Sequence, residues 1–141
     1  MNKKIILSLL AIFIILTSVS IVSAGAETVD FGKFTLAIDG EQISNTTMGS
    51  GGEQVSMYDY DLNGNNLTVL VMPGQEDNDA IIDSFINDDG YKKTNPIGEF
   101  IVLETPEGNY EGIYFGDDYW VAIIFKDMDS GKQILESFKT K

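Results

Sequence analysis

An Asn-Gly pair between two alternating runs constrains the fold of this chain more than any other feature. Apolar and polar residues alternate in Val55–Leu62 and again in Leu67–Met72, which is the period of a half-buried strand. The intervening Asn63-Gly64 tolerates the positive φ angles that a tight turn between antiparallel strands requires. These residues predict a β-hairpin, and with it an antiparallel sheet.

Further strand patterns occur at spacings that suit consecutive hairpins. Turn-forming Gly and Pro residues separate them. The runs are Val29–Ile38, Phe100–Thr105, Tyr110–Phe115 and Tyr119–Lys126, with a short one at Tyr91–Thr94 that we expect to pair nearby. The polar stretch Glu41–Gly52 lacks periodicity and contains several glycines, so we interpret it as a flexible loop.

Two segments have helical spacing instead. Glu76–Asn87 places its apolar residues on one face, and so does Ser130–Lys139. Ser130 and Gln133 have the spacing of a capping box at the start of the second helix. The sequence therefore predicts an α+β fold. We expect an antiparallel, meander-like β-sheet with two short helices packed on one face, preceded by an N-terminal signal or anchor helix.

The N-terminus has the three-part layout of a secretory signal peptide. Lys3 and Lys4 precede the uncharged apolar stretch Ile5–Leu16. Small residues after this stretch offer two cleavage sites, one before Gly25 and one before Glu27. Cleavage at either site would release the acidic remainder of the chain.

An uncleaved membrane anchor is the alternative, because residues 5–26 contain no charge and could just span a bilayer. Basic residues precede the apolar segment and the acidic body follows it, so the positive-inside rule places the body outside the cytoplasm in both cases. We divide the chain into a signal peptide or membrane anchor, residues 1–26, and one small α+β domain, residues 27–141. Membrane contact is expected only through the N-terminal segment.

The composition excludes several classes of function. The chain contains no His, no Cys and no Arg. This removes His- or Cys-dependent nucleophilic catalysis, thiol redox centres, His- or Cys-ligated metals and Arg clamps. Residues 27–141 carry seven lysines and 22 acids, a net charge of −15, and such a domain is a poor partner for nucleic-acid phosphates. Without disulfides, its stability must come from packing.

The predicted hairpin also contains part of a calcium-binding pattern. Asp59, Asp61, Asn63 and Asn65 have the spacing that begins an EF-hand-type loop, in which oxygen ligands converge on Ca²⁺ around a Gly turn. Leu70 occupies the twelfth position, where a bidentate Glu is expected, and the flanking segments are strand-like. A plain hairpin turn and a weak Ca²⁺ site are the two interpretations. We expect no other cofactor.

Acidic groups elsewhere could bind cations or act as acid–base pairs. A glycosidase holds two carboxyls at a defined separation across a cleft. With 22 acids in a small domain, some pairs arise by chance, and a solvated surface accounts for them. Helix capping accounts for the acidic turn Asp127–Gly131. The other groups are Asp88-Asp89, Asp117-Asp118 and the set Glu76, Asp77, Asp79 and Asp83. We expect no enzymatic activity from any of them.

Aromatic residues and glycosylation sequons complete the candidate sites. Tyr119 and Trp120 could stack on a sugar or on a partner protein if they are exposed, and they belong to the core if the strand alternation buries them. Asn45 and Asn66 each begin an N-x-[ST] sequon, which is usable in an exported chain whose host glycosylates.

The C-terminal segment Ile134–Phe138, with its Glu-Ser-Phe sequence, ends a strands, helix, strands, helix order that resembles the PsbP/Mog1-like superfamily of small exported domains. In that superfamily a strand, here Trp120–Phe125, leads through a loop into a final helix with Ser-Phe near its end. The resemblance covers Gly32–Lys139 and implies an extracytoplasmic accessory or binding fold that is mostly non-enzymatic. Glu41–Gly52 lacks the Trp that many members carry after the first strand. No metal or partner residues of the family can be placed on this sequence.

These features together predict a small exported, non-catalytic binding or accessory domain at the cell envelope. Its partner would be an envelope protein or a glycan that the sequence does not identify, and nucleic acid is not expected. A cation-dependent, Ca²⁺-binding structural protein of the envelope is the first alternative. A carboxylate-based hydrolase is the second.

Overall fold

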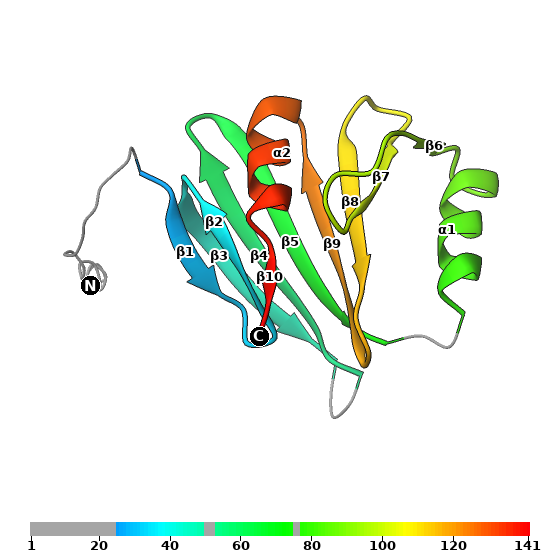
Figure 1. The fold of residues 1–141 in the computed structure, drawn as a ribbon, viewed down its shortest axis with the longest axis horizontal. Helices are drawn as coiled ribbons and strands as arrows, with labels where there is room; N and C mark the ends of the chain where they lie inside the picture. The colour runs from blue at the N-terminus through cyan, green and yellow to red at the C-terminus, as the bar shows by residue number, and fades with distance from the viewer. Residues whose placement is uncertain (1–24, 50–52, 75–76) are drawn as a thin grey trace.

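Two antiparallel sheets and two helices form the part of the chain that the computed structural model describes, which is residues 25–49, 53–74 and 77–141 (Figure 1). The larger sheet has seven strands, and every pairing within it is antiparallel. In spatial order its strands are β3 (Glu41–Met48), β4 (Val55–Leu62), β5 (Asn65–Pro73), β9 (Tyr119–Phe125), β8 (Tyr110–Phe115), β7 (Ile101–Glu104) and β6 (Lys92–Lys93). The expected α+β class is confirmed.

A smaller sheet of three strands lies in front of the large one together with the second helix (Figure 1). Its order is β1 (Glu27–Asp30), β2 (Phe34–Ile38) and β10 (Lys139–Thr140). Helix α1 (Asn78–Asn87) lies at the β7 end of the large sheet, and helix α2 (Met128–Glu136) crosses the middle of its front face. We call the front face the α2 face and the opposite one the α1 face.

The two helices cover opposite faces of the large sheet, so the prediction that they share one face was wrong. In β7, Val102 packs in the core beneath α2, whereas its neighbour Leu103 packs against Ile82 of α1. Consecutive side chains of a strand point to opposite faces. The reason is visible in Val121–Phe125, which is apolar at every position and therefore needs cover on both sides.

The core of the α2 face is built from aromatic rings. Phe34, Phe100 and Phe125 are all 2% exposed or less. The ring of Phe138 lies between two of them, 5.4 Å from Phe34 and 5.0 Å from Phe100 between centroids. Burial of several aromatic side chains, each worth a few kcal/mol, stabilises this layer in a chain that has no cysteine for a disulfide.

Helix α2 approaches the sheet closely because small residues lie at the contact. A Cβ at Gly131 would lie 2.1 Å from Cδ2 of Phe125, and a Cβ at Gly112 would lie 2.9 Å from Cδ1 of Leu135. The end of the helix is tied to the small sheet through Ser137, whose hydroxyl accepts the Ala37 N–H at 2.8 Å and donates to the Ile134 carbonyl at 2.6 Å. Close contact and end fixation together set the position of α2.

Several element boundaries differ from the sequence prediction. Glu41–Gly52 is not a flexible loop in its described part: residues 41–48 form β3, an edge strand that needs little apolar alternation because it is largely exposed. Val29–Ile38 contains parts of two strands, since the chain turns at Phe31–Lys33. The predicted hairpin is confirmed, with Asn63 at φ 58° and Gly64 at φ 102°.

Helix α2 also begins earlier than predicted. Asp127 is its N-cap and accepts hydrogen bonds from the backbone N–H and the hydroxyl of Ser130 at 3.3 and 2.7 Å. The capping box that would start at Ser130 is therefore wrong, while the capping role expected of the acidic turn is confirmed. The local sequence offered two candidate N-caps three residues apart, Asp127 and Ser130. The carboxylate of Asp127 is the one that accepts a free backbone N–H of the first turn.

The predicted signal or anchor segment lies outside the described residues, apart from its last two positions. Among the helices that the structure describes, neither has the length and apolar character needed to cross a membrane.

Candidate functional site

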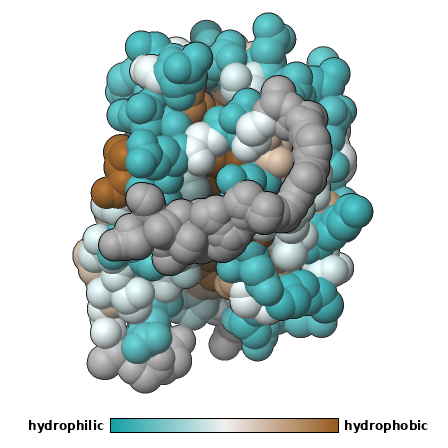
Figure 2. All heavy atoms as spheres, turned by 90° about the vertical axis from the view of Figure 1, so that its left-hand side faces the viewer, coloured by the Kyte–Doolittle hydropathy of each residue, from teal (hydrophilic) through white to brown (hydrophobic). Residues whose placement is uncertain are grey.

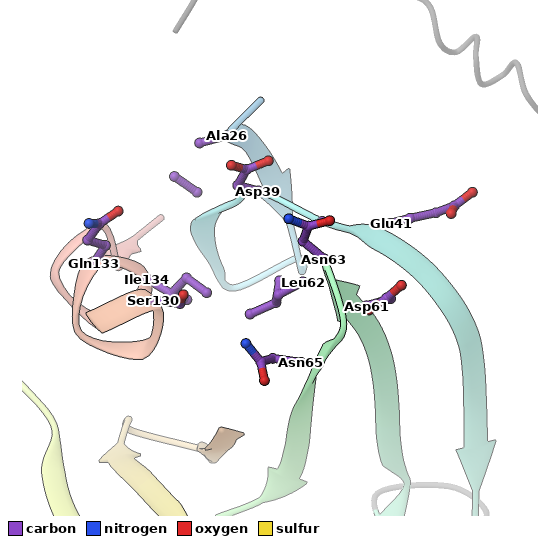
Figure 3. A pocket seen from close by; sticks show the side chains of 12 residues that line it. Ala26, Asp39, Glu41, Asp61, Leu62, Asn63, Asn65, Ser130, Gln133 and Ile134 are labelled. Atoms are coloured by element: carbon purple, nitrogen blue, oxygen red, sulfur yellow. The ribbon is translucent and has the colours of Figure 1, made fainter. Parts of the chain in front are cut away.

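A cavity of about 760 Å³ opens at one end of the molecule, where four segments meet (Figure 3). Its walls are the turn between β2 and β3, the hairpin turn between β4 and β5, helix α2, and Ala26 just before β1. The lining residues are Ala26, Ala37, Asp39, Gly40, Glu41, Asp61, Leu62, Asn63, Asn65, Ser130, Gln133 and Ile134. Segments distant in sequence thus converge on one space.

The cavity has an apolar floor and a polar rim. Leu62 and Ile134 extend toward each other across the floor (Figure 3). Amide and hydroxyl groups of Asn65, Ser130 and Gln133 surround them, and Asp39 lies at the upper rim. Binding sites for small polar ligands combine apolar contact area with a few positioned polar groups, which is the combination found here.

The charge of the lining is negative. Of the residues that the structure describes, three with carboxylates and no lysine line the cavity. Glu41 and Asp61 point away from its centre, and Asp39 remains at the rim (Figure 3). This arrangement disfavours anionic ligands and suits neutral or cationic ones.

The four residues of the calcium-like pattern do not converge on one point. Asp61, Asn63 and Asn65 line the cavity, but Asp59 does not. The Asp59 carboxylate lies on the α1 face, where it accepts hydrogen bonds from the hydroxyls of Ser44 and Thr68, both at 2.7 Å. These bonds hold its pKa below the usual range of a carboxyl.

Asp61 is also committed to a structural contact. Its Oδ1 accepts the Gly64 N–H at 2.8 Å and so closes the hairpin turn. Asn63 supplies a positive φ to the same turn. Within residues 25–49, 53–74 and 77–141, no group of three or more Asp or Glu side chains has an arrangement that could hold a metal ion.

Tyr119 and Trp120 point to opposite faces of β9 and do not form one aromatic surface. Tyr119 packs beside the α2-face core and lies under the Lys33 ammonium, 5.5 Å from nitrogen to ring centroid. Trp120 packs with Phe115 in the cluster under α1, 5.8 Å between ring centroids. Both are half-buried, and the Trp120 Nε1–H has no hydrogen-bond acceptor among the described residues.

The two sequons are accessible. Asn45 lies on the edge strand β3 and Asn66 at the start of β5, and both side chains are exposed. Their exposure is compatible with glycosylation in a host that carries it out.

The acidic pairs singled out in the sequence lie on the surface, and the one carboxyl that is buried among the described residues was missed. Asp118 pairs with Lys33 at 3.1 Å, and Asp88 accepts a hydrogen bond from the Ser84 hydroxyl at 3.2 Å. Glu111, in contrast, is only 5% exposed. Burial raises its pKa to about 7, although a hydrogen bond from the Tyr91 hydroxyl opposes the rise. The available signal was its phase, since Glu111 lies two and four positions before Ile113 and Phe115, the apolar residues of β8 that face α1.

Glu111 does not line the cavity. It lies beneath α1 on the α1 face, opposite Leu103 and Ile124 in the sheet register, whereas the cavity is bounded by α2 and the two turns.

Comparison of the chain with models of known protein families, with curated proteins and with solved structures returned no match.

Proposed function

We propose that this chain is a small exported, non-catalytic binding domain that holds a neutral or cationic polar ligand in the cavity at the start of α2. The observation that carries the proposal is the cavity itself, with its Leu62 and Ile134 floor, its amide and hydroxyl rim and, among the described lining residues, carboxylates as the only charged groups. A terminal sugar of an envelope glycan and a short polar peptide segment both have the matching chemistry. The N-terminal basic and apolar sequence supports export, and the resemblance to PsbP/Mog1-like domains agrees with an accessory role.

A binding role fits this cavity better than hydrolysis does. A glycosidase needs an acid with a raised pKa and a second carboxyl facing it across the cleft. Two of the three lining carboxylates point away from the cavity, and the carboxyl whose pKa burial raises, Glu111, lies on the other side of the sheet.

Titration of the exported, isotopically labelled protein with a defined panel tests the proposal. The panel contains chitotriose, trialanine, putrescine and inorganic phosphate. We expect at least one of the first three to shift the backbone NMR signals of Asn65, Ser130 and Gln133, while phosphate does not. Absence of any shift at the lining residues with all panel members at 10 mM, a concentration set on the order of weak small-ligand affinities, would contradict it.

Matched variants on α2 sharpen this test. Gln133 lines the cavity and its exposed neighbour Lys132 does not. We expect Gln133→Ala to weaken binding of the responding panel member about fivefold or more, as the loss of roughly 1 kcal/mol implies. Lys132→Ala should leave the affinity within about twofold, and an equal loss in both variants would place the ligand elsewhere.

A cation-dependent structural role is the second candidate, because Asp39, Asp61, Asn63 and Asn65 all line the cavity and carry oxygen atoms that Ca²⁺ accepts as ligands. Calorimetry with CaCl₂ tests it, with melting temperature as a second readout. Heat of binding that disappears in Asn65→Ala but persists in Asp59→Asn would support this candidate. No heat and no change in melting temperature at millimolar calcium, a typical concentration for weak extracellular sites, would remove it.

A further inference from the structure

The α1 face of the large sheet is covered over only part of its width. Ile82 of α1 packs against Leu103 of β7 and Ile113 of β8, and the surrounding cluster extends no further than Trp120 of β9. The side chains of β4 and β5 that alternate with the buried α2-face residues therefore lie beyond this cluster. Among the described residues, no helix or strand of the chain packs over them.

Apolar side chains line this uncovered part, which we call the open strip. Met57 lies opposite Leu70, and Met72 lies opposite Trp120 in the sheet register. Ile124 continues the strip onto β9. Met57, Leu70, Met72 and Ile124 are all half-buried, so part of their apolar surface meets water. Methionine side chains are flexible and adapt to a partner's surface.

The width of the open strip matches one helix. Neighbouring strands lie about 4.8 Å apart, so the distance from β4 across β5 to β9 is roughly 10 Å. An α-helix with its side chains is about 10 Å across. One further helix beside α1 would therefore cover the strip, just as α1 covers β7 and β8.

The segments that border the open strip on two sides are acidic, and Lys126 follows β9 at the end of the strip. No lysine or arginine occurs between Lys33 and Lys92, and β3, β4, β5 and α1 all come from that interval. On one side, α1 and its flanks carry Asp77, Asp79, Asp83, Asp88 and Asp89; on the other, β4 and the residues before it carry Glu53, Asp59 and Asp61. Two acidic borders enclose an apolar centre.

Asp59 gives the strip a fixed anionic group. The hydroxyls of Ser44 and Thr68 hold its carboxylate in place at 2.7 Å each. The ion pairs within the described residues are Lys33–Asp118 and Lys141–Asp30, and neither involves Asp59. Its charge is thus oriented by neutral donors and is available to a cation from outside the chain.

We propose that the open strip docks an amphipathic basic helix of a partner protein, with leucine-like side chains on Met57, Leu70, Met72 and Ile124 and a lysine or arginine paired with Asp59. Helices that present an apolar row flanked by cations bind surfaces of this kind. The surface is separate from the cavity beside α2, so the ligand-binding role and this docking role can each hold without the other.

A designed peptide provides the probe. The peptide is an amphipathic helix of leucine and lysine, about 18 residues long, which corresponds to roughly 27 Å. Two controls have the same length: a scrambled sequence of the same composition, and a leucine and glutamate version of the same pattern. We expect the leucine–lysine helix to bind the exported protein and to shift NMR signals of β4, β5 and β9 residues on the open strip. Equal binding by the scrambled peptide, shifts spread evenly over the acidic surface, or no binding would overturn the proposal.

Matched charge changes locate the contact. Met57→Lys places a cation in the strip and should weaken peptide binding at least tenfold, and Asp59→Asn should weaken it severalfold. Ile43→Lys makes a similar change at a side chain that is 58% exposed on edge strand β3, and it should alter binding less than twofold. A loss at Ile43→Lys as large as that at Met57→Lys would indicate strand addition at the β3 edge and would overturn the proposal.

Two outcomes test other occupants. Sedimentation that finds a dimer dispersed by Met57→Lys would assign the strip to a second copy of this chain and contradict a basic helix. Binding of the leucine–glutamate peptide with the same affinity would show that the strip binds any apolar helix face regardless of charge, and it would contradict the proposed basic helix. The NMR map does not depend on variants, so a variant that fails to fold leaves the peptide test decisive.

Discussion

The two faces of the seven-stranded sheet are stabilised in different ways. The α2 face is covered by a helix and a second sheet, and its core is apolar and aromatic throughout. The α1 face is covered by one short helix, and it contains a buried carboxyl, Glu111, and a carboxylate held by hydroxyls, Asp59. The comparison indicates that stability is concentrated on the α2 face, while the α1 face retains groups that respond to pH or to a partner.

The largest expected effect comes from opening a hole in the α2 face. Phe34 is fully buried and its ring contacts those of Phe31, Phe138 and Tyr119. We expect Phe34→Ala to lower the free energy of unfolding by about 3–5 kcal/mol, measured by urea denaturation. Met57→Ala on the open strip should cost about 1 kcal/mol or less, because that side chain is half-exposed. Similar losses in both variants would remove the contrast between the faces.

The buried carboxyl of the α1 face should make the stability of the protein depend on pH. Burial raises the pKa of Glu111 to about 7 from 4.5, so between these values the folded protein binds more protons than the unfolded chain. The contribution of Glu111 to stability therefore falls by at most about 3 kcal/mol as pH rises from about 4.5 to about 7. Above about pH 7 the contribution is constant. Glu111→Gln should abolish this part of the pH dependence in urea titrations. Glu104→Gln on the neighbouring strand is the control, and a pH profile unchanged by Glu111→Gln would contradict the expectation.

A smaller loss should follow when α2 is pushed off its face. A Cβ at Gly131 would lie within 2.6 Å of three ring atoms of Phe125, which is buried and cannot move aside. We expect Gly131→Ala to destabilise the protein by about 1–3 kcal/mol, despite the better helix propensity of alanine. Thermal unfolding measures the loss, and Lys132→Ala on the exposed side of α2 should change stability by less than about 0.5 kcal/mol.

The smallest effect compares the two helices directly. Asp127 and Asp77 cap α2 and α1, and each accepts the backbone N–H three residues on, at 3.3 and 3.0 Å. Each change to Ala should cost about 0.5–2 kcal/mol. Because α2 belongs to the main core, Asp127→Ala should lower the global melting temperature. Asp77→Ala should act mainly on hydrogen exchange within α1, and global unfolding of equal size in both would show that the faces are not separate units.

The local parts of the fold were predictable from the sequence, and the long-range parts were not. Asn63-Gly64 located the hairpin because a turn is decided by a few adjacent residues. Edge strand β3 was missed because an exposed strand has no need for apolar alternation. Its Ile43 and Met48 are the large apolar side chains most exposed among the described residues. Figure 2 views the molecule from the left-hand side of Figure 1 and shows a mostly hydrophilic surface there. No pattern of apolar and polar residues within β3 indicates that it pairs with β4.

The candidate site was predictable only in fragments for the same reason. The sequence placed Asp59, Asp61, Asn63 and Asn65 in one calcium loop. The last three of these residues do line one cavity. Their neighbours there, Ser130 and Gln133, come from a helix more than sixty positions later in the sequence. Asp59 was separated from the set because β4 is extended and places it farther from the turn, where it accepts hydrogen bonds from Ser44 and Thr68.

The pairing of β2 with the last strand has a consequence for the order in which the protein can be assembled. The front layer is closed by contacts between residues 100 and 111 positions apart, from Ala37 to Ser137 and from Asp30 to Lys141. Such closure costs loop entropy and slows folding, and the front layer can form only after the residues around Ser137 and Lys141 have been synthesised.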